Sequence, residues 1–155
     1  MRTLFVSVLV SLVTLGACTS SQSPSEKVDY TQLVNPFVGT DFTGNTYPGA
    51  QAPFGMVQLS PDNGLAGWDR ISGYFYPDST IAGFSHTHLS GTGAGDLYDV
   101  LFMPVTLPFK EAEGELGNHS KFSHQDEEAS AGYYRVKLQD YNINVELTAT
   151  PRCGV

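Results

Sequence analysis

The strongest constraint on the fold is a strict alternation of apolar and polar side chains near the end of the chain. Every second residue is apolar in residues 132–139, and the pattern returns in residues 143–148 after Asp140-Tyr141-Asn142. Successive side chains of a β-strand point to opposite faces of a sheet, so this pattern predicts a hairpin of two half-buried strands. The side chains predicted to face the core are Tyr134, Val136, Leu138, Ile143, Val145 and Leu147.

From Asp29 onward the rest of the chain also predicts short strands. Its apolar runs are brief, turn-forming residues recur at short intervals, and no long helical period is present. We predict strands in residues 55–60, 81–89 and 99–105, the last a core strand because it is nearly continuously apolar. This organisation predicts an all-β fold, an antiparallel β-sandwich, with a minor helical turn near Ala129. Because the sequence stops just after a strand, we expect only part of the sandwich.

The N-terminal residues have the pattern of an export signal. A positively charged start precedes an apolar run, Leu4–Leu15, that is too short to span a bilayer comfortably. The exit, Leu15-Gly16-Ala17-Cys18, resembles the lipobox of bacterial lipoproteins, whose cysteine carries lipid and becomes the mature N-terminus. The resemblance implies a signal peptide over residues 1–17 and lipidation at Cys18. An ordinary signal peptide with an incidental cysteine is the alternative.

Residues 18–28 are expected to form the lipidated cysteine and a flexible tether, because serine and other polar side chains dominate there. The β-sandwich domain then covers residues 29–155. Membrane contact is expected through the lipid alone. Thr19 stands where an Asp often signals retention in the inner membrane, so the expected location is the cell envelope, anchored to the outer membrane.

The charge of the chain excludes one class of partner. The formal net charge is −8, from 16 acidic and 8 basic residues, whereas phosphate backbones require a basic patch. Nucleic acid is therefore not an expected partner, and a neutral polar ligand such as a sugar suits the composition better. With Cys18 lipidated, Cys153 is the one remaining thiol, and we expect it to be a small buried hydrophobe.

Two stretches carry candidate binding residues. Trp68 lies beside Asp69, and an indole face packs on a sugar ring while a carboxylate accepts hydrogen bonds from hydroxyls. A buried tryptophan beside solvated charges is the alternative. In the second stretch, His86 and His88 would share one face of a strand, which is also the geometry of a cupin-like metal site.

No catalytic residue is predicted in this chain. Ser123, His124 and Asp126 lie close in sequence, but hydrolase triads are assembled in space and no nucleophile-elbow pattern is present. Glycosidic hydrolysis normally needs two placed carboxyl groups, and the spacing of the carboxylates singles out no pair.

Taken together, the ordered motifs of residues 29–155 resemble the N-terminal domain of glycoside hydrolase family 92, the exo-acting α-mannosidases. The motifs are VNPFVGT (34–40), TYPGA (46–50), PFGMVQLSPD (53–62), GWD (67–69), SGY (72–74), GFSHTHLSGTG (83–93), KFSH (121–124), GYYRVKL (132–138) and ELTAT (146–150).

The resemblance implies a β-sandwich packed on a C-terminal (α/α)6 barrel, with calcium-dependent inverting hydrolysis of α-mannosides, often α-1,2-linked, at their junction. It implies that catalytic groups and most calcium ligands belong to that C-terminal domain, so this chain alone is expected to be inactive. Trp68, Asp69, His86 and His88 would then contribute contacts to mannose-containing glycans or to the domain interface. A stand-alone lipid-anchored carbohydrate-binding module is a second hypothesis, and the cupin-like metal site a third.

Overall fold

The computed structural model describes residues 27–64, 67–91, 93, 95–106 and 117–155. The predicted signal peptide and Cys18 lie outside these residues. In the described part of the chain, no helix is long and apolar enough to cross a membrane.

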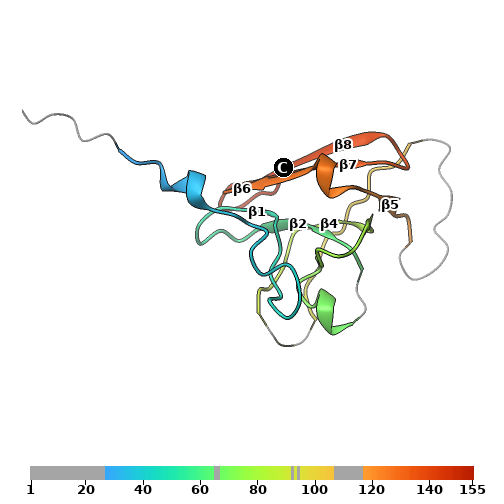
Figure 1. Ribbon diagram of the computed structural model, residues 1–155, viewed down its shortest axis with the longest axis horizontal. Coiled ribbons are helices and arrows are strands. Elements are labelled where there is room, and N and C mark those ends of the chain that lie inside the picture. The colour runs from blue at the N-terminus through green and yellow to red at the C-terminus, as the bar shows by residue number, and fades with distance from the viewer. Residues whose placement is uncertain (1–26, 65–66, 92, 94, 107–116) are drawn as a thin grey trace, which may run out of the picture.

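The described residues form short antiparallel strands and brief 3-10 turns (Figure 1). One three-stranded sheet has the order β1-β2-β4, a second has the order β6-β7-β8, and β3 pairs with β5 beside them. The strands are β1 (Ala50–Gln51), β2 (Gln58–Asp62), β3 (Thr80–Ile81), β4 (Gly83–Ser85), β5 (Ser120–Lys121), β6 (Glu127–Ser130), β7 (Tyr133–Leu138) and β8 (Ile143–Thr148). The 3-10 turns are η1 (Tyr30–Leu33), η2 (Trp68–Arg70) and η3 (His124–Asp126).

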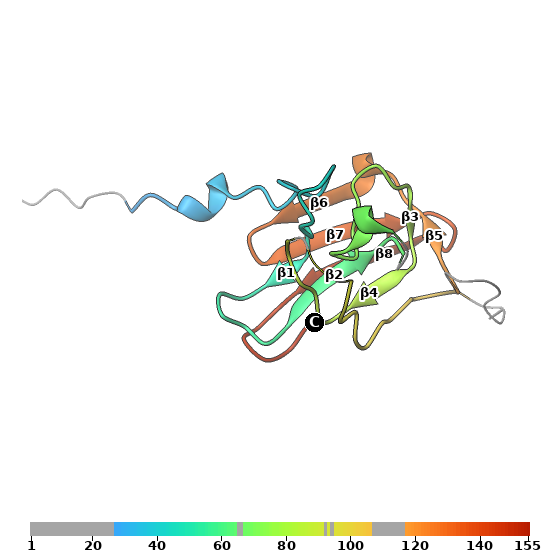
Figure 2. The ribbon, with the colours of Figure 1, turned by 90° about the horizontal axis from the view of Figure 1, so that it is seen from below.

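The two sheets stack face to face and enclose the core (Figures 1 and 2). The predicted antiparallel β-sandwich is therefore confirmed. β2 directs Leu59 and β4 directs Phe84 inward, where they meet the apolar face of the β6-β7-β8 sheet. The core residues that β7 and β8 contribute are Tyr134, Val136, Leu138 and Leu147.

The alternating segment forms the predicted hairpin. β7 and β8 pair with Tyr134 opposite Leu147 and Val136 opposite Val145, so their apolar side chains share one face. Asn142 has a φ of +53°, a left-handed conformation that asparagine tolerates better than most residues. The period of two thus determined both the strands and their buried face.

A third layer of loops covers the outer face of the β1-β2-β4 sheet (Figure 1). It contains residues 37–49 and the segment that begins at η2. Since strand side chains alternate, Ser60 and Asp62 of β2 point away from Leu59, toward this layer. This loop layer holds most of the candidate site.

Residues 99–105 do not form the predicted core strand. Only Phe102 bridges to Phe84 of β4, and Leu101 and Phe102 are 46% and 59% exposed. The backbone has positive φ at Leu97, Tyr98 and Val100, which interrupts extended pairing. An apolar run therefore lies along the edge of the sheet instead of inside it.

Two smaller predictions were also wrong. Ala129 lies in β6, and the helical turn precedes it as η3, where the Ser123 side chain accepts a hydrogen bond from the Gln125 backbone N–H. Cys153 is exposed because it sits in a tight turn, in which its backbone N–H donates to the Thr150 hydroxyl at 2.9 Å.

Candidate functional site

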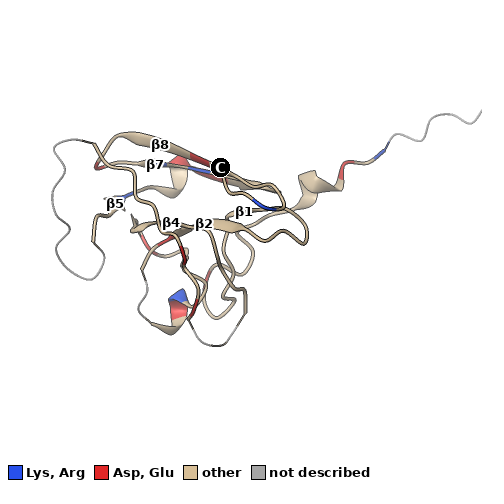
Figure 3. Ribbon diagram, turned by 180° about the vertical axis from the view of Figure 1, so that it is seen from behind, with Lys and Arg blue, Asp and Glu red and all other residues tan. Residues whose placement is uncertain are grey.

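The tip of the loop layer presents Trp68 and Asp69 to solvent. Both belong to η2, which begins after Gly67, a residue with a φ of +98°. Trp68 is 75% exposed, and Asp69 is also exposed. The charged pair of η2 lies at the end of the molecule away from the two sheets (Figure 3). The buried-tryptophan alternative is therefore wrong.

A two-point ion pair closes the segment behind this tip. The Arg70 Nε donates to Asp78 Oδ2 at 2.6 Å, and its Nη2 donates to Asp78 Oδ1 at 2.5 Å. The same guanidinium lies 5.5 Å from the centre of the Phe75 ring. The hydrogen bonds to Asp78 raise the pKa of Arg70, so the guanidinium keeps its charge. The tip is thereby braced against the next turn.

Asn63 ties the same segment to the end of β2. Its backbone N–H donates to the Gly73 carbonyl at 2.8 Å, and its side-chain oxygen accepts from the Phe75 N–H at 2.6 Å. Its amide nitrogen donates to the Thr80 carbonyl at 2.7 Å. One buried amide therefore satisfies the backbone of an irregular loop, as buried polar groups require.

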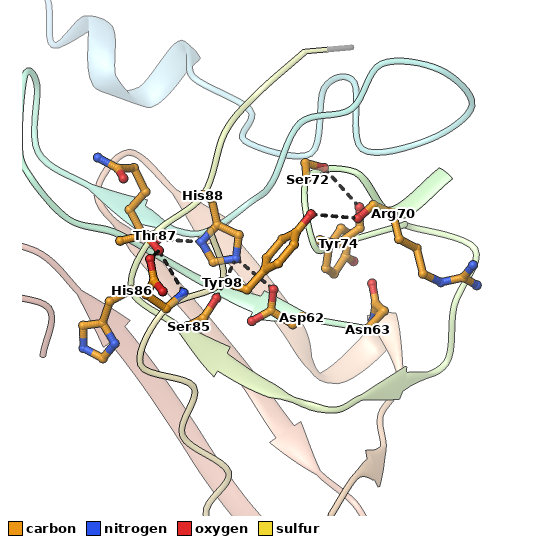
Figure 4. A network of polar contacts seen from close by, with 12 residues as sticks. Asp62, Asn63, Arg70, Ser72, Tyr74, Ser85, His86, Thr87, His88 and Tyr98 are labelled. Atoms are coloured by element: carbon orange, nitrogen blue, oxygen red, sulfur yellow. Dashed lines mark hydrogen bonds and ion pairs between the residues drawn. The ribbon is translucent and has the colours of Figure 1, made fainter. Parts of the chain in front are cut away.

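Beneath the loops, His88 forms a buried polar network (Figure 4). Its Nδ1 is 2.7 Å from the Gln58 carbonyl oxygen, which only accepts, so Nδ1 carries a proton. Its Nε2 is 2.9 Å from Asp62 Oδ1 and 3.1 Å from Ser85 Oγ. The side chains of His88 and Asp62 are 0% and 1% exposed. Burying such a pair is costly. Both nitrogens of His88 have partners, whereas Asp62 Oδ2 has none among the described residues.

Tyrosine rings enclose the same imidazole. Tyr47 and Tyr98 lie 5.0 Å and 6.0 Å from the His88 ring, measured between centroids. The Tyr98 hydroxyl donates to the Ile71 carbonyl, so Tyr98 connects His88 to the loop that follows η2. His88 thus supports the loop layer from the interior, and Trp68 and Asp69 present the exposed surface.

His86 does not join His88. Both residues follow the end of β4, and the His86 ring points away from the network (Figure 4). The His86 Nδ1 lies 3.1 Å from the Val100 carbonyl, and its ring packs edge-on against Phe102. The expectation of one shared strand face was therefore wrong, because β4 ends at Ser85.

The described residues do not fit a metal site. Within them, no group of three or more His, Cys, Asp or Glu side chains could hold an ion. The two nitrogens of His88 already have protein partners. The cupin-like hypothesis, which needs His86 and His88 on one ion, does not fit this part of the chain.

The Ser123, His124 and Asp126 stretch is not a catalytic arrangement. The His124 Nδ1 pairs with Glu127 Oε2 at 2.6 Å, and the Ser123 hydroxyl caps η3. Sequence reasoning missed the structural roles of Asp62 and Glu127. For Asp62 a signal existed, because it lies on the same strand face as Ser60, opposite Leu59.

Comparison with known proteins identifies the family. Residues 33–155 match the glycosyl hydrolase family 92 N-terminal domain. The chain belongs to glycoside hydrolase family 92. Its fold resembles that of a family 92 α-mannosidase from Bacteroides thetaiotaomicron in complex with mannoimidazole. That similarity has a TM-score of 0.77 and 49% identity, covering 82% of this chain and 17% of that one.

Two further relatives support the same assignment. A family 92 inverting mannosidase from Bacteroides thetaiotaomicron has a TM-score of 0.63 and 31% identity, covering 83% of this chain and 18% of its own. An uncharacterised secreted glycosidase from Arthroderma benhamiae is 31% identical over 94% of this chain and 19% of its own length. The chain thus spans about a fifth of the length of these relatives.

Proposed function

We propose that this chain is the sugar-facing N-terminal β-sandwich of an α-mannosidase. The observation that carries the proposal is the exposure of Trp68 and Asp69 on a braced loop, in a chain that belongs to family 92. The relative that binds mannoimidazole, 49% identical over the matched residues, supports a mannose-type ligand.

In this proposal the η2 tip forms one wall of a sugar subsite. The Trp68 indole packs against the apolar face of a pyranose ring, and the Asp69 carboxylate accepts hydrogen bonds from its hydroxyl groups. The Arg70–Asp78 ion pair and the Asn63 bonds hold the tip before the sugar arrives. A loop that is already ordered loses less conformational entropy on binding.

Hydrolysis itself is assigned to groups outside this chain. Inversion requires an acid and a base that flank the scissile bond, about 6.5–9.5 Å apart. One relative is an inverting mannosidase, and we propose the same stereochemistry here, with α-1,2-linked mannosides among the substrates. We also propose that the complete enzyme depends on calcium, and that most of the residues that bind it belong to a C-terminal domain outside this chain.

The sugar contact can be tested by fluorescence, because Trp68 is the only tryptophan in the sequence. Titration with mannoimidazole should change its emission, and Asp69→Asn should weaken binding by roughly tenfold, about 1.4 kcal/mol. Asp126→Asn, at another exposed carboxylate in a 3-10 turn, is the matched control. If the emission change is saturable and Asp69→Asn has the same affinity as wild type, Asp69 does not bind the sugar.

The alternative function is a stand-alone carbohydrate-binding module that uses the same exposed surface. It requires the 155-residue chain to bind a mannoside without any other domain, and to unfold cooperatively. In the mannosidase proposal, the missing walls of the subsite make binding by this chain weaker than binding by the complete enzyme. Comparing the two affinities for mannoimidazole separates the functions.

We further propose export and lipid anchoring at Cys18 to the outer membrane. The lipobox-like sequence supports this location, and the Arthroderma relative is described as secreted. Labelled palmitate should enter the wild-type protein and Cys153→Ala, but not Cys18→Ala. Equal labelling of Cys18→Ala would contradict the anchor.

A further inference from the structure

A buried carboxylate connects the loop layer to the β6-β7-β8 sheet. Glu127, the first residue of β6, has a side chain that is 1% exposed. Its Oε1 accepts from the Tyr134 hydroxyl at 2.6 Å and from the Tyr74 hydroxyl at 3.0 Å. Its Oε2 faces the His124 Nδ1 at 2.6 Å and the Tyr74 hydroxyl at 3.1 Å.

The three donors come from three parts of the fold. Tyr134 belongs to β7, His124 belongs to η3, and Tyr74 belongs to the segment that follows η2. A carboxyl group in a core is tolerated only when hydrogen-bond partners replace its water. Burial and the nearby carboxylate raise the pKa of both tyrosines, so their hydroxyls keep the protons that they donate.

Tyr74 is the inward anchor of the sugar-facing segment. Its ring is 1% exposed and packs in the core, while Trp68 in the same segment lies in solvent. The adjoining Ser72 hydroxyl donates to the Thr46 carbonyl at 2.9 Å, and Phe75 is tied to Asn63. The position of Tyr74 therefore determines where the segment leaves the sandwich.

We infer that Glu127 is a positioning residue for the sugar surface, acting on Trp68 and Asp69 through the Tyr74 hydroxyl. The effect of Glu127 on sugar affinity rests on the proposed function. The effect of Glu127 on the position of the loop does not depend on any ligand. Glu127 lies in β6, in the other sheet, and its side chain is buried.

The chain provides a matched control beside it. Glu128 is the next residue of β6, but its side chain is 55% exposed and pairs with Arg135 at 2.8 Å on the outer face. Tyr134 provides a second control, because it donates to Glu127 without belonging to the loop layer. Variants of Glu128 and Tyr134 therefore distinguish a loss of core stability from a displacement of the loop.

The test measures Trp68 fluorescence anisotropy, the thermal midpoint and the affinity for mannoimidazole in the full chain. At a temperature where every variant is folded by circular dichroism, Glu127→Gln and Tyr74→Phe should lower the anisotropy. They should also weaken binding by roughly 3- to 10-fold. Glu128→Gln should change none of the three quantities, and Tyr134→Phe should lower the midpoint alone.

The inference is overturned if Tyr74→Phe leaves the anisotropy unchanged, or if Tyr134→Phe lowers it equally. Should Glu127→Gln fail to fold, the comparison of the two tyrosine variants decides the matter. If the wild type binds no mannoside, the proposed function fails, and the anisotropy measurement still decides the positioning role.

Discussion

At the scale of single residues, the main feature is the burial of ionisable side chains under the loop layer. Asp62 and His88 pair within the outer face of β2 and β4, and Glu127 lies between the sheet and Tyr74. Alternation along β2 places Asp62 on the face opposite Leu59, but it does not identify the partners of Asp62 and Glu127, because their contacts join residues that are distant in sequence. Their hydrogen bonds appear only once the loops fold over the sheet.

Asp62→Asn should destabilise the chain by about 1–3 kcal/mol, because it disturbs the buried hydrogen bond between Asp62 and His88. The free energy of unfolding in urea measures this loss. Asp69→Asn, at an exposed carboxylate, should stay within about 0.5 kcal/mol of wild type. Equal stability of Asp62→Asn and Asp69→Asn would show that the buried pair contributes nothing.

Stability should fall at alkaline pH. Folding raises the pKa of Tyr74 and Tyr134 above the ordinary value near 10, so above that pH the folded chain holds protons that the unfolded chain has lost. The stabilisation is complete below pH 10 and decreases by about 1.4 kcal/mol per pH unit for each tyrosine.

Tyr74→Phe should reduce the pH dependence of the free energy of unfolding by the contribution of one tyrosine. Denaturant unfolding between pH 9 and pH 11, roughly one unit on either side of the ordinary tyrosine pKa, measures it. Tyr30→Phe, at a residue that is 72% exposed, is the control. A slope that Tyr74→Phe leaves unchanged would contradict the account.

At the scale of elements, the β7-β8 hairpin was predictable, and the edge of the β1-β2-β4 sheet was not. The hairpin follows from local alternation and a short turn. Residues 99–105 are as apolar as a core strand, but the positive φ of Val100 and the edge position of the segment depend on the surrounding loops. Periodicity determines which face is buried, and it does not determine whether a segment pairs.

Gly73→Ala should destabilise the loop layer severely, by more than about 1–2 kcal/mol. Gly73 has a φ of +86°, and an added Cβ would lie 2.3 Å from Asp62 Oδ1 and 3.1 Å from the His88 ring. Gly91→Ala is the matched control, since its φ is +102° but nothing lies within 4 Å of the added atom. Thermal midpoints should therefore rank wild type, Gly91→Ala and Gly73→Ala in descending order.

At the scale of the whole molecule, the family was recognisable from ordered motifs, whereas the roles of the histidines were not. GWD correctly drew attention to an exposed Trp68. The motif GFSHTHLSGTG suggested that His86 and His88 are paired. The strand ends before them, however, and His88 turns inward while His86 contacts Val100. A sequence motif shows that residues occur together and leaves their burial open.

The proposed calcium dependence predicts that removal of the ion affects catalysis and not this domain. A chelator should abolish α-mannoside hydrolysis by the complete polypeptide, and it should leave the thermal midpoint of the 155-residue chain unchanged. The reason is that the described residues form no cluster suited to the ion. A chelator-induced shift of that midpoint would place a calcium site within this chain.

The most direct test is the hydrolysis of an aryl α-mannoside by the polypeptide whose reading frame contains this chain. Wild type should hydrolyse it, and Trp68→Ala should lower kcat/KM by roughly tenfold or more, because the subsite loses its apolar wall. Absence of α-mannoside hydrolysis, or identical kinetics in Trp68→Ala, would contradict the proposal that this β-sandwich forms part of a mannosidase sugar site.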